Sequence, residues 1–548
     1  MASPAQTIAD TSSSQESKID LSEQGKTTFA SNTPAQQLEA QQEVGVGGVG
    51  RTHRKLKNRH IAMIGFGSGI GTGLFVGTGS ALANAGPLGL LLAYSITGGI
   101  LWCVMQCIGE MATLIPTAGT FPHFATRFIS PSVGFSLALS YFYCYAISVA
   151  SELSAAAVLV SFWAPDLSPA VTISVGLVAL IALNFVGVNW YGESEVIFSS
   201  IKILLFVGLI ILGIVLDLGG GPDHKRLGFH YWKVDGPFQE FLAFWSAFIN
   251  AGYTYIGIEC VAIAAGEASQ PSKQIPRAVK RVVWRILICY IGAVLVIGVL
   301  VSANDPDLVT GTGNANSSPF VIAIRRAGIP ALPSIINAAV LTSAWSAGNS
   351  YLYVASRTLL AMSLDKQAPE IFSRVNKHGV PIYAVGFSSL FGFLAYLSLG
   401  SGGAGLAFTW LLNLSTIAGL IAWGTLCFAF IRFHRACKVQ GVDRNTLPFK
   451  SNFQPYTAWF GFISTVVIII FSGWSVFLDG QWDTSSFFAS YIGIPIFVVP
   501  IIAWAIIKKT PFHRASAMDL WSGRLSPEDE VPEPKPTTRI GKFFDYLA

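Results

Sequence analysis

The sequence predicts an all-α polytopic membrane protein with twelve transmembrane helices, and three observations lead to this prediction. The 548 residues are 52% hydrophobic and only 12% charged, whereas soluble globular proteins carry about 25% charged residues. The mean hydropathy is +0.54. Apolar stretches of about 20 residues, the length that crosses a bilayer core, recur along most of the chain. A surface with so few charges suits lipid rather than water.

The chain divides into a transmembrane domain between two polar tails. Residues 1–57 are rich in Ser, Gln and Ala, a composition that predicts a disordered cytosolic tail. No apolar segment of a signal peptide follows the first methionine, so we expect the first span to direct membrane insertion. The transmembrane domain is predicted over 58–510, and a second cytosolic tail over 511–548.

The predicted spans follow one another along the transmembrane domain, and their even number places both termini on the same side of the membrane. In chain order they are 61–81, 87–110, 132–162, 168–188, 194–216, 239–266, 278–302, 332–356, 381–399, 405–431, 456–478 and 486–507.

The distribution of Lys and Arg predicts the orientation. With the N-terminus inside, the inner flanks and loops hold 23 Lys and Arg residues and the outer loops hold 5. Cytoplasmic loops carry such an excess, so both termini are predicted to be cytosolic and the loops 217–238 and 303–331 to face outward. A glycosylation sequon at Asn316, in the second of these loops, agrees with this orientation.

Other classes of function lack support in the sequence. The net charge of +5 is small and gives no sign of nucleic-acid binding. The seven cysteines lie without metal-ligand spacing, mostly in apolar runs, which favours a packing role. The motifs HExxH and GxSxG and the acidic rings typical of channels are absent from the sequence. We therefore expect neither an enzyme nor a channel, and no metal or cofactor.

A glycine cluster interrupts the first span. Glycines occupy alternate positions from Gly65 to Gly73, and each disfavours a helix by roughly 1 kcal/mol relative to Ala. Unwound backbone is tolerated in a membrane only where it lines a cavity and finds partners there, and the half-helix beyond it presents N–H groups to an anion. We interpret the cluster as a binding break, with close packing through small residues as the alternative. The GxGxxG spacing of a nucleotide loop fails at Thr72.

The sixth span carries a second interruption. Gly252 and Gly257 flank residues 253–256, and Glu259 lies near the middle of the span. Paired interruptions at equivalent positions of two halves are the best sequence indication of a transporter site. The first break would offer N–H groups to a carboxylate and the second C=O groups to an ammonium. Together they would hold the head group that α-amino acids share.

Ionisable side chains inside the predicted spans are few. They are Glu152, Lys202 and Glu259, with Glu110 near an inner end. An unpaired charge in the membrane costs several kcal/mol, so each is a functional candidate by default. A structural ion pair within the helix bundle is the alternative for each of them, and it is the preferred interpretation of Glu110 at the water boundary.

Several motifs resemble the amino acid–polyamine–organocation superfamily of transporters. They lie at 70–77, 109–119, 257–271, 275–278 and 356–357, and the likeness runs from about residue 55 to 510. The fungal amino acid permease branch is the most similar. The resemblance implies the LeuT-type fold, with ten helices in two inverted five-helix repeats plus two further helices. It also implies a place in the plasma membrane and import of amino acids by proton symport with alternating access.

The resemblance further implies where the substrate binds. Its carboxylate would be bound by four residues of the first span, and its amine by three backbone carbonyls of the sixth. These two sets are Ser68, Gly69, Gly71 and Thr72, and Tyr253, Thr254 and Ile256. Tyr253 and Tyr351 correspond to aromatic gating residues of the family. Cys144, Ala146 and Ser148 would line the pocket for the substrate side chain.

Proton coupling is expected to involve the buried titratable groups. Lys202 is similar to a lysine that replaces a sodium site in some family members, and Glu152 is similar to a third-span carboxylate of the fungal branch. Lys202 is the first candidate because a desolvated lysine readily loses and regains a proton. Glu259 and Glu152 are the competing candidates.

The identity of the amino acid is only partly indicated. A charged side chain would need a countercharge, and Glu152 could serve a cationic one, but the fungal branch carries this carboxylate across specificities. We therefore expect a neutral amino acid, with proline among the candidates. Two alternatives stay open: an exchanger or facilitator without proton coupling, and a nutrient-sensing homologue, for which the tails of about 60 and 40 residues are short.

Overall fold

The computed structural model of the chain is helical, with no strand among the residues that it describes, so the predicted all-α class is confirmed for that part of the chain. Contacts divide the chain into 1–47 and 48–548, and everything described belongs to the second unit. The described residues are 63, 71–116, 120–186, 188–222, 224–239, 243–260, 271–309, 318–329, 331–376, 379–400 and 403–524.

The helices follow one another along the chain with short connections. In order they are η1 (Gly73–Gly77), α3 (Thr78–Leu114), α4 (Thr120–Phe128), α5 (Pro131–Val160), α6 (Pro169–Val186), α7 (Val188–Asp217), α8 (His230–Val234), α9 (Phe244–Tyr255), α11 (Pro271–Arg285), η2 (Ile286–Ile291), α12 (Gly292–Leu300), α13 (Pro306–Val309), α14 (Pro319–Arg326), α15 (Leu332–Leu364), η4 (Glu370–Ser373), α16 (Ile382–Leu390), η5 (Phe391–Leu399), α17 (Gly403–Val439), η6 (Arg444–Thr446), α18 (Tyr456–Phe471), η7 (Trp474–Phe477), α19 (Thr484–Tyr491), α20 (Gly493–Lys508) and η8 (Ala515–Ala517).

Among the described residues, six helices are long and apolar enough to cross a membrane. They are Gly73–Leu114, Pro131–Val160, Pro169–Val186, Tyr191–Asp217, Ile382–Leu399 and Gly403–Val439. The pair α19 and α20, bent by 51°, adds a seventh if it forms one span. Each of the remaining predicted spans also contains helix within the described residues. The total of twelve transmembrane helices stays a prediction.

The first two predicted spans meet at a sharp turn inside α3. Gly86 has a φ of 73°, outside the helical region, and Pro87 follows it. A side chain at this position would be strained by the positive φ and would also lie 3.0 Å from Pro237 O. The turn is held there by Leu88 N, which donates to Pro237 O at 2.9 Å. Position 86 therefore requires glycine, both because φ is positive and because the backbone of Pro237 lies so close.

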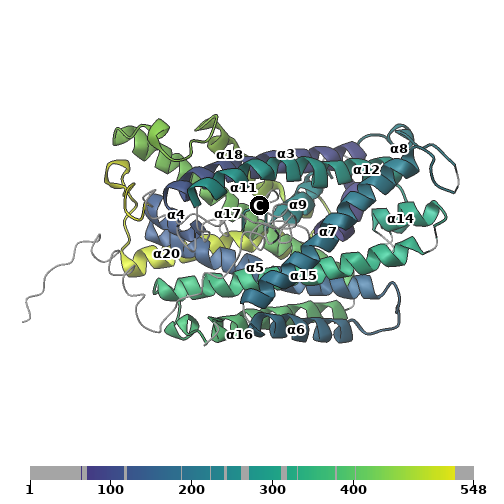
Figure 1. Ribbon diagram of the computed structural model, residues 1–548, viewed down its shortest axis with the longest axis horizontal. Helices are drawn as coiled ribbons and strands as arrows, with labels where there is room; N and C mark the ends of the chain where they lie inside the picture. The colour runs from purple at the N-terminus through teal and green to yellow at the C-terminus, as the bar shows by residue number, and fades with distance from the viewer. Residues whose placement is uncertain are drawn as a thin grey trace, which may run out of the picture. The chain divides into compact units, whose positions relative to one another are not determined.

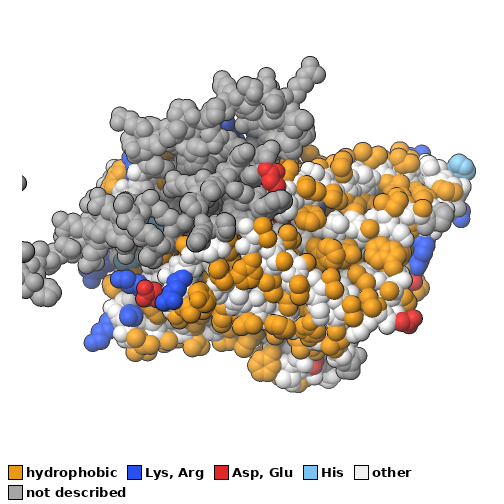
Figure 2. Space-filling view, turned by 60° about the horizontal axis from the view of Figure 1, so that its bottom comes forward, with side chains coloured by type: hydrophobic (Ala, Val, Ile, Leu, Met, Phe, Trp, Pro, Cys, Tyr) orange, Lys and Arg blue, Asp and Glu red, His pale blue; other side chains and the backbone are white. Residues whose placement is uncertain are grey.

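Burial separates inner helices from lipid-facing ones. The apolar segments of α5 and α17 are 89% and 83% buried, whereas that of α6 is only 28% buried. α5 packs along α15 and α17, and α3 packs along α9 (Figure 1). Hydrophobic side chains cover much of the face in Figure 2, and most of the charged ones lie towards its ends. An apolar surface around a packed interior is what a lipid environment requires.

The two ends of this helical unit differ in their segments. α8 and α14 lie at one end, and α4 and the C-terminal end of α20 lie at the other (Figure 1). The segments at the first end belong to the loops predicted to face outward. There Arg326 pairs with Asp305 at 2.5 Å, and Arg325 pairs with Asp307.

The first part of the predicted C-terminal tail packs on the second end. His513 N donates to Ile129 O at 3.0 Å. Arg127 and Asp519 form an ion pair at 3.1 Å, and Gln440 Nε2, directly after α17, donates to Met518 O at 2.8 Å. Residues 511–524 therefore contact the ends of α4 and α17 rather than extending away from them.

Two sequence-based interpretations are confirmed here. All seven cysteines are free, and six of them are buried. Glu110 is fully buried in a structural ion pair, because Arg444 contacts both of its oxygens at 2.7 Å. Ser451 adds donors from its backbone N at 2.9 Å and its hydroxyl at 2.6 Å.

Candidate functional site

The end of the first break is held against a carboxylate of α5. Gly71 and Thr72 are not helical, and the π-helical turn η1 begins directly after them. Thr72 N donates to Glu152 Oε1 at 3.4 Å, and Thr72 Oγ1 donates to Glu152 Oε2 at 3.0 Å. The Thr72 N–H, one of those predicted to bind an anion, therefore donates to a carboxyl group supplied by the protein itself. Ser68 and Gly69 lie outside the described residues.

Glycine is needed on the side of the break that faces α5 and α9. A Cβ atom at Gly71 would lie 2.5 Å from Glu152 Oε1 and 3.5 Å from Ala347 Cβ. A Cβ atom at Gly73 would lie 2.7 Å from Thr254 Oγ1. Both values for the nearest neighbours fall short of ordinary contact, so the break packs closely and also presents a polar group. The binding and packing interpretations of the glycine cluster are thus compatible.

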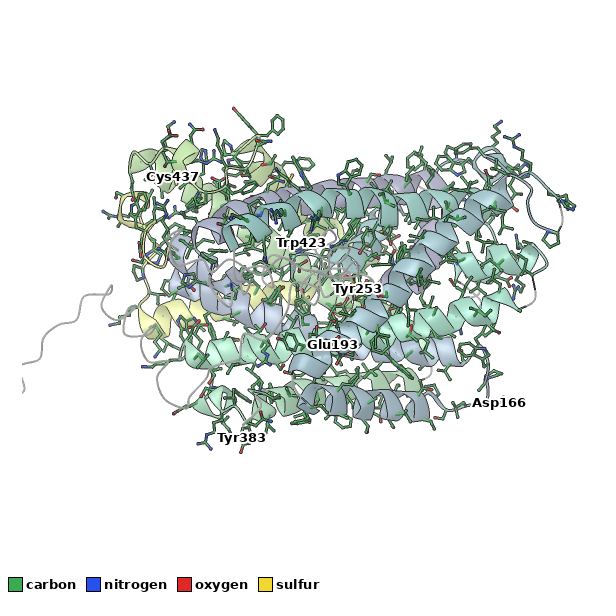
Figure 3. The ribbon with its side chains drawn as sticks, viewed as in Figure 1. Asp166, Glu193, Tyr253, Tyr383, Trp423 and Cys437 are labelled. Carbon is green, nitrogen blue, oxygen red and sulfur yellow. The ribbon has the colours of Figure 1, made fainter. Side chains whose placement is uncertain are left out.

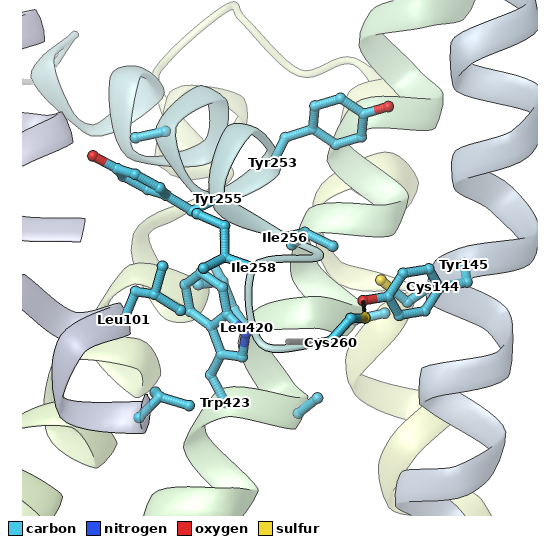
Figure 4. Close-up of a cluster of buried hydrophobic side chains, with 14 of the residues drawn as sticks. Leu101, Cys144, Tyr145, Tyr253, Tyr255, Ile256, Ile258, Cys260, Leu420 and Trp423 are labelled. Atoms are coloured by element: carbon cyan, nitrogen blue, oxygen red, sulfur yellow. Dashed lines mark hydrogen bonds between the residues drawn. The ribbon is translucent and has the colours of Figure 1, made fainter. Parts of the chain in front are cut away.

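The sixth predicted span is interrupted, but later than predicted, because Gly252 and residues 253–255 belong to α9. α9 ends at Tyr255, Ile256 is extended with φ −59° and ψ 136°, and Gly257 has a φ of 99°. Beyond the break Glu259 Oε2 accepts from Gly257 N at 3.0 Å, and Oε1 accepts from the Tyr145 hydroxyl at 3.2 Å. Figure 4 shows the chain turning between Ile256 and Cys260, with Tyr145 to one side of this turn.

Tyr253 connects the second break to the first. Its hydroxyl donates to Glu152 Oε1 at 3.1 Å, and its ring meets Phe408 edge-on with centroids 6.2 Å apart. Its carbonyl, one of the predicted amine ligands, accepts from Ile256 N at 3.2 Å. The side chain lies on α9 near the centre of the view in Figure 3. Glu152 therefore joins three elements: α5, α9 and the first break.

The other predicted aromatic gate lies close by. Tyr351 on α15 is buried, and its ring meets Tyr145 with centroids 5.6 Å apart. Tyr145 also donates to Glu259, so it contacts Tyr351 through its ring and the carboxyl group through its hydroxyl. The structure thus brings Tyr351 and Glu259 together through Tyr145, a residue that was not singled out from the sequence.

Thr254, another residue predicted to bind the substrate amine, contacts Tyr94 of α3 rather than Glu152. The Tyr94 hydroxyl lies 2.9 Å from Thr254 Oγ1 and donates to Asn250 Oδ1 at 2.7 Å. Asn250 Nδ2 in turn donates to Gly73 O at 3.4 Å. The Thr254 side chain therefore ties α9 to α3, and Asn250 was missed. An amide in an apolar span was the signal that could have identified it.

Lys202 is fully buried on α7 and interacts electrostatically with two carboxylates, Glu195 and Glu152. The hydroxyl of Ser199, one turn earlier, donates to Met63 O at 2.8 Å, so α7 lies against the start of the first span. Lys202, the first candidate for proton coupling, therefore interacts with Glu152, one of the two competing candidates.

Glu195 is the third residue that the sequence did not single out, after Tyr145 and Asn250. It is fully buried, and Ser346 Oγ donates to its two oxygens at 3.2 and 3.1 Å. Asn349 Nδ2 donates to Oε1 at 3.5 Å. Its place at the very start of the predicted span 194–216 made it look like a boundary residue. The acidic side chain within that span was nevertheless a signal.

The residues predicted to line the side-chain pocket lie near the second break. Cys144 Sγ donates to Ser415 O at 3.2 Å, Ser148 Oγ donates to Cys144 O at 2.8 Å, and Ala146 is buried. A Cβ atom at Gly419 would lie 2.5 Å from Ile256 Cδ1 and 3.6 Å from Cys144 Sγ. Cys144 and Ile256 therefore share an apolar corner, and both residues are labelled in Figure 4.

Apolar helices around a polar centre built on two interrupted helices define a multi-pass membrane protein. The described residues contain no group of three or more His, Cys, Asp or Glu that could hold a metal ion. What they contain instead is a set of N–H, hydroxyl, carboxylate and ammonium groups. Such groups bind and exchange small charged head groups and protons.

Comparison with known proteins gives the family. The sequence model of the amino acid permease family matches residues 60–517. A proline-specific permease of Emericella nidulans is 40% identical over 489 residues, which cover 86% of this chain and 88% of that relative. A dicarboxylic amino acid permease of Saccharomyces cerevisiae is 38% identical over 86% of this chain and 80% of its own length. A proline-specific permease of the same yeast is 40% identical over 90% and 82%.

The chain therefore belongs to the amino acid permease family. The resemblance to fungal amino acid permeases is confirmed, and so are the multi-pass membrane setting and the transport function that the family name describes.

Proposed function

We propose that this permease imports amino acids across the plasma membrane by proton symport with alternating access. Twelve helices, ten of them in two inverted five-helix repeats of the LeuT type, would form the transport unit, with both termini in the cytosol. The observation that supports the proposal most directly is the position of Glu152, which accepts from Thr72 at the first break and from Tyr253 beside the second.

In this proposal the substrate carboxylate takes the donors that now face Glu152. Thr72, together with Ser68, Gly69 and Gly71, would bind it, and the carbonyls of the second break would bind the amine. Two carboxylates around one Thr72 repel each other strongly where the dielectric constant is low. Substrate therefore binds when Glu152 moves away or takes up a proton. A protonated carboxyl donates a hydrogen bond instead of only accepting, which links binding to protonation.

Tyr253 and Tyr351 would close the site on its two sides. Tyr253 lies directly on Glu152, so its hydroxyl loses a partner whenever Glu152 leaves its place. Tyr351 contacts Tyr145, which holds Glu259. Both rings are buried, as closed gates are, and a rotation of either would expose the polar centre to one side of the membrane.

The apolar corner at Cys144 and Ile256 favours a neutral substrate, with proline among the candidates. A charged side chain placed there would need a countercharge, because an isolated charge in such surroundings is costly. Relatives at similar identity carry names with different substrates, proline for one and dicarboxylic amino acids for another. Overall sequence identity therefore does not distinguish between substrates. In this proposal the residues that line the corner at Cys144 and Ile256 select the amino acid.

Uptake assays in a permease-deficient yeast test the proposal. Each proteinogenic amino acid is offered as a competitor of radiolabelled proline, at acidic and at neutral external pH and with a protonophore. We expect a small set of neutral amino acids to compete, and accumulation to rise at acidic pH and collapse with the protonophore. Counterflow that is indifferent to both conditions would identify an exchanger or facilitator, and signalling without uptake would identify a sensor.

A further inference from the structure

Lys202 shares its surroundings with a carboxylate outside the binding breaks. Glu195 precedes it by seven residues on α7, and residues seven apart lie on the same face of a helix two turns from each other. Glu195 is nearer the start of α7 by about 10 Å, taking 1.5 Å per residue. The proposed topology places that start on the cytosolic side.

The surroundings of Glu195 are built for a charged or hydrogen-bonded carboxyl group. Ser346 and Asn349 of α15 donate to it, and Asn184 Nδ2 of α6 donates to Asn349 Oδ1 at 2.8 Å. Residues of α15 and α6 therefore fix the orientation of the donors to Glu195 on α7. Buried acidic residues in membrane proteins are costly and mark proton or ion pathways more often than they serve packing.

Lys202 interacts electrostatically with both Glu195 and Glu152. With all three ionised, these groups carry one net negative charge, which is expensive in a buried site. One additional proton on either carboxyl group makes the set neutral. Two arrangements are then possible: Glu152 protonated with Lys202 paired to Glu195, or the reverse.

Among the described residues, the other titratable groups that interact with this set are tyrosines. Tyr253 of α9 donates to Glu152. Tyr191 of α7 interacts electrostatically with Glu195, and Tyr351 of α15 does so with Glu152. On α15 Arg357 lies further along and contacts Gly379 O. α6 and α12, which also pack on α7, contain no titratable residue, and neither does the stretch 64–70 of the first span. Protons near neutral pH are therefore shared among the three charged groups.

We propose that Glu195 is a proton-carrying residue of the transport cycle, the second place at which the symported proton resides. The proton first resides on Glu152, with Lys202 paired to the Glu195 carboxylate. Lys202 then gives a proton to Glu195 and takes the one on Glu152, so that the ammonium is regenerated and the number of protons is unchanged. Glu152 becomes a carboxylate paired with Lys202, and Glu195 holds the proton nearer the proposed cytosolic side. This inference rests on the proposed proton symport.

The test compares two identical substitutions on α7. Glu195→Gln keeps the shape and can still accept from Ser346, but it cannot carry a proton. Glu193→Gln is the matched control, since Glu193 is exposed on the same turn (Figure 3). Full-length variants in proteoliposomes are assayed for exchange of preloaded substrate and for accumulation driven by an imposed pH gradient. Glu195→Asp is the conservative variant that keeps a carboxyl group.

For Glu195→Gln we expect exchange close to the wild-type rate, loss of accumulation, and uptake that no longer rises as external pH falls. Glu195→Asp should restore accumulation, and Glu193→Gln should behave as wild type. Normal pH-driven accumulation by Glu195→Gln would overturn the inference. A second outcome would also overturn it: Glu195→Gln loses both exchange and substrate binding, and Glu195→Asp does not restore accumulation. If wild-type protein itself shows no pH-driven accumulation, the proposed symport fails instead.

Discussion

Replacing Gly71 by Ala perturbs the centre of the proposed site by one methyl group. The new Cβ atom would lie 2.5 Å from Glu152 Oε1, where ordinary contact begins at 3.4 Å. The shortfall from 3.4 Å to 2.5 Å is about 0.9 Å, so the carboxylate oxygen has to leave its position. In the proposed function a substrate carboxylate oxygen takes that same position, and it would meet the same obstacle.

The size of the effect follows from the hydrogen bonds at this position. Displacing the oxygen removes at least one hydrogen bond to a charged group, and such a bond contributes about 1.5–3 kcal/mol. Because 1.4 kcal/mol corresponds to a factor of ten, the apparent affinity for substrate should fall by about 10- to 150-fold. Gly71→Leu, which fills the space entirely, should abolish uptake.

Initial uptake rates over a range of substrate concentrations measure this effect, with surface expression followed by a fluorescent tag. Gly208→Ala on α7 is the matched control, because its added Cβ atom would meet nothing within 4 Å. We expect the control to be unchanged in both expression and apparent affinity. If Gly71→Ala reaches the surface and transports with unchanged apparent affinity, Gly71 packs closely for structural reasons alone, and the substrate head group binds elsewhere.

Three further predictions concern gating, coupling and stability. Tyr253→Phe removes the donor to Glu152 but keeps the ring, so we expect weaker coupling to pH with retained surface expression, measured as uptake at acidic and neutral pH. Lys202→Met should abolish pH-driven accumulation in proteoliposomes and spare exchange, and normal accumulation would make Lys202 a structural cation. In α4, outside the candidate spans, burial and the neighbouring Arg127 cation lower the pKa of His123 from 6.5 to about 4. Between these values the unfolded chain binds more protons, so stability should be lost as pH falls from 6.5 towards 4. His123→Gln should flatten the corresponding thermal melting profile in detergent.

The sequence determined the class of the protein because lipid imposes local requirements. Each span has to be apolar over its own length and to satisfy its own backbone hydrogen bonds. Composition and periodicity therefore indicated helices at the right places, and glycines indicated the second break, where Gly257 adopts its positive φ. The interruption near Gly71 was recognisable for the same reason, since a run of glycines weakens a helix wherever it occurs.

Only the tertiary structure decided which groups meet at the centre. Thr72 and Glu152 are 80 residues apart, and Glu110 and Arg444 are 334 apart, so their pairing depends on how the helices pack. The same is true of Glu195, which looked like the boundary of a span and is buried because α15 covers it. A charged residue within a predicted span indicates only that its side chain needs an oppositely charged or hydrogen-bonding partner. Contact between side chains on different helices, over a few ångströms in a low dielectric, determines which partner it has.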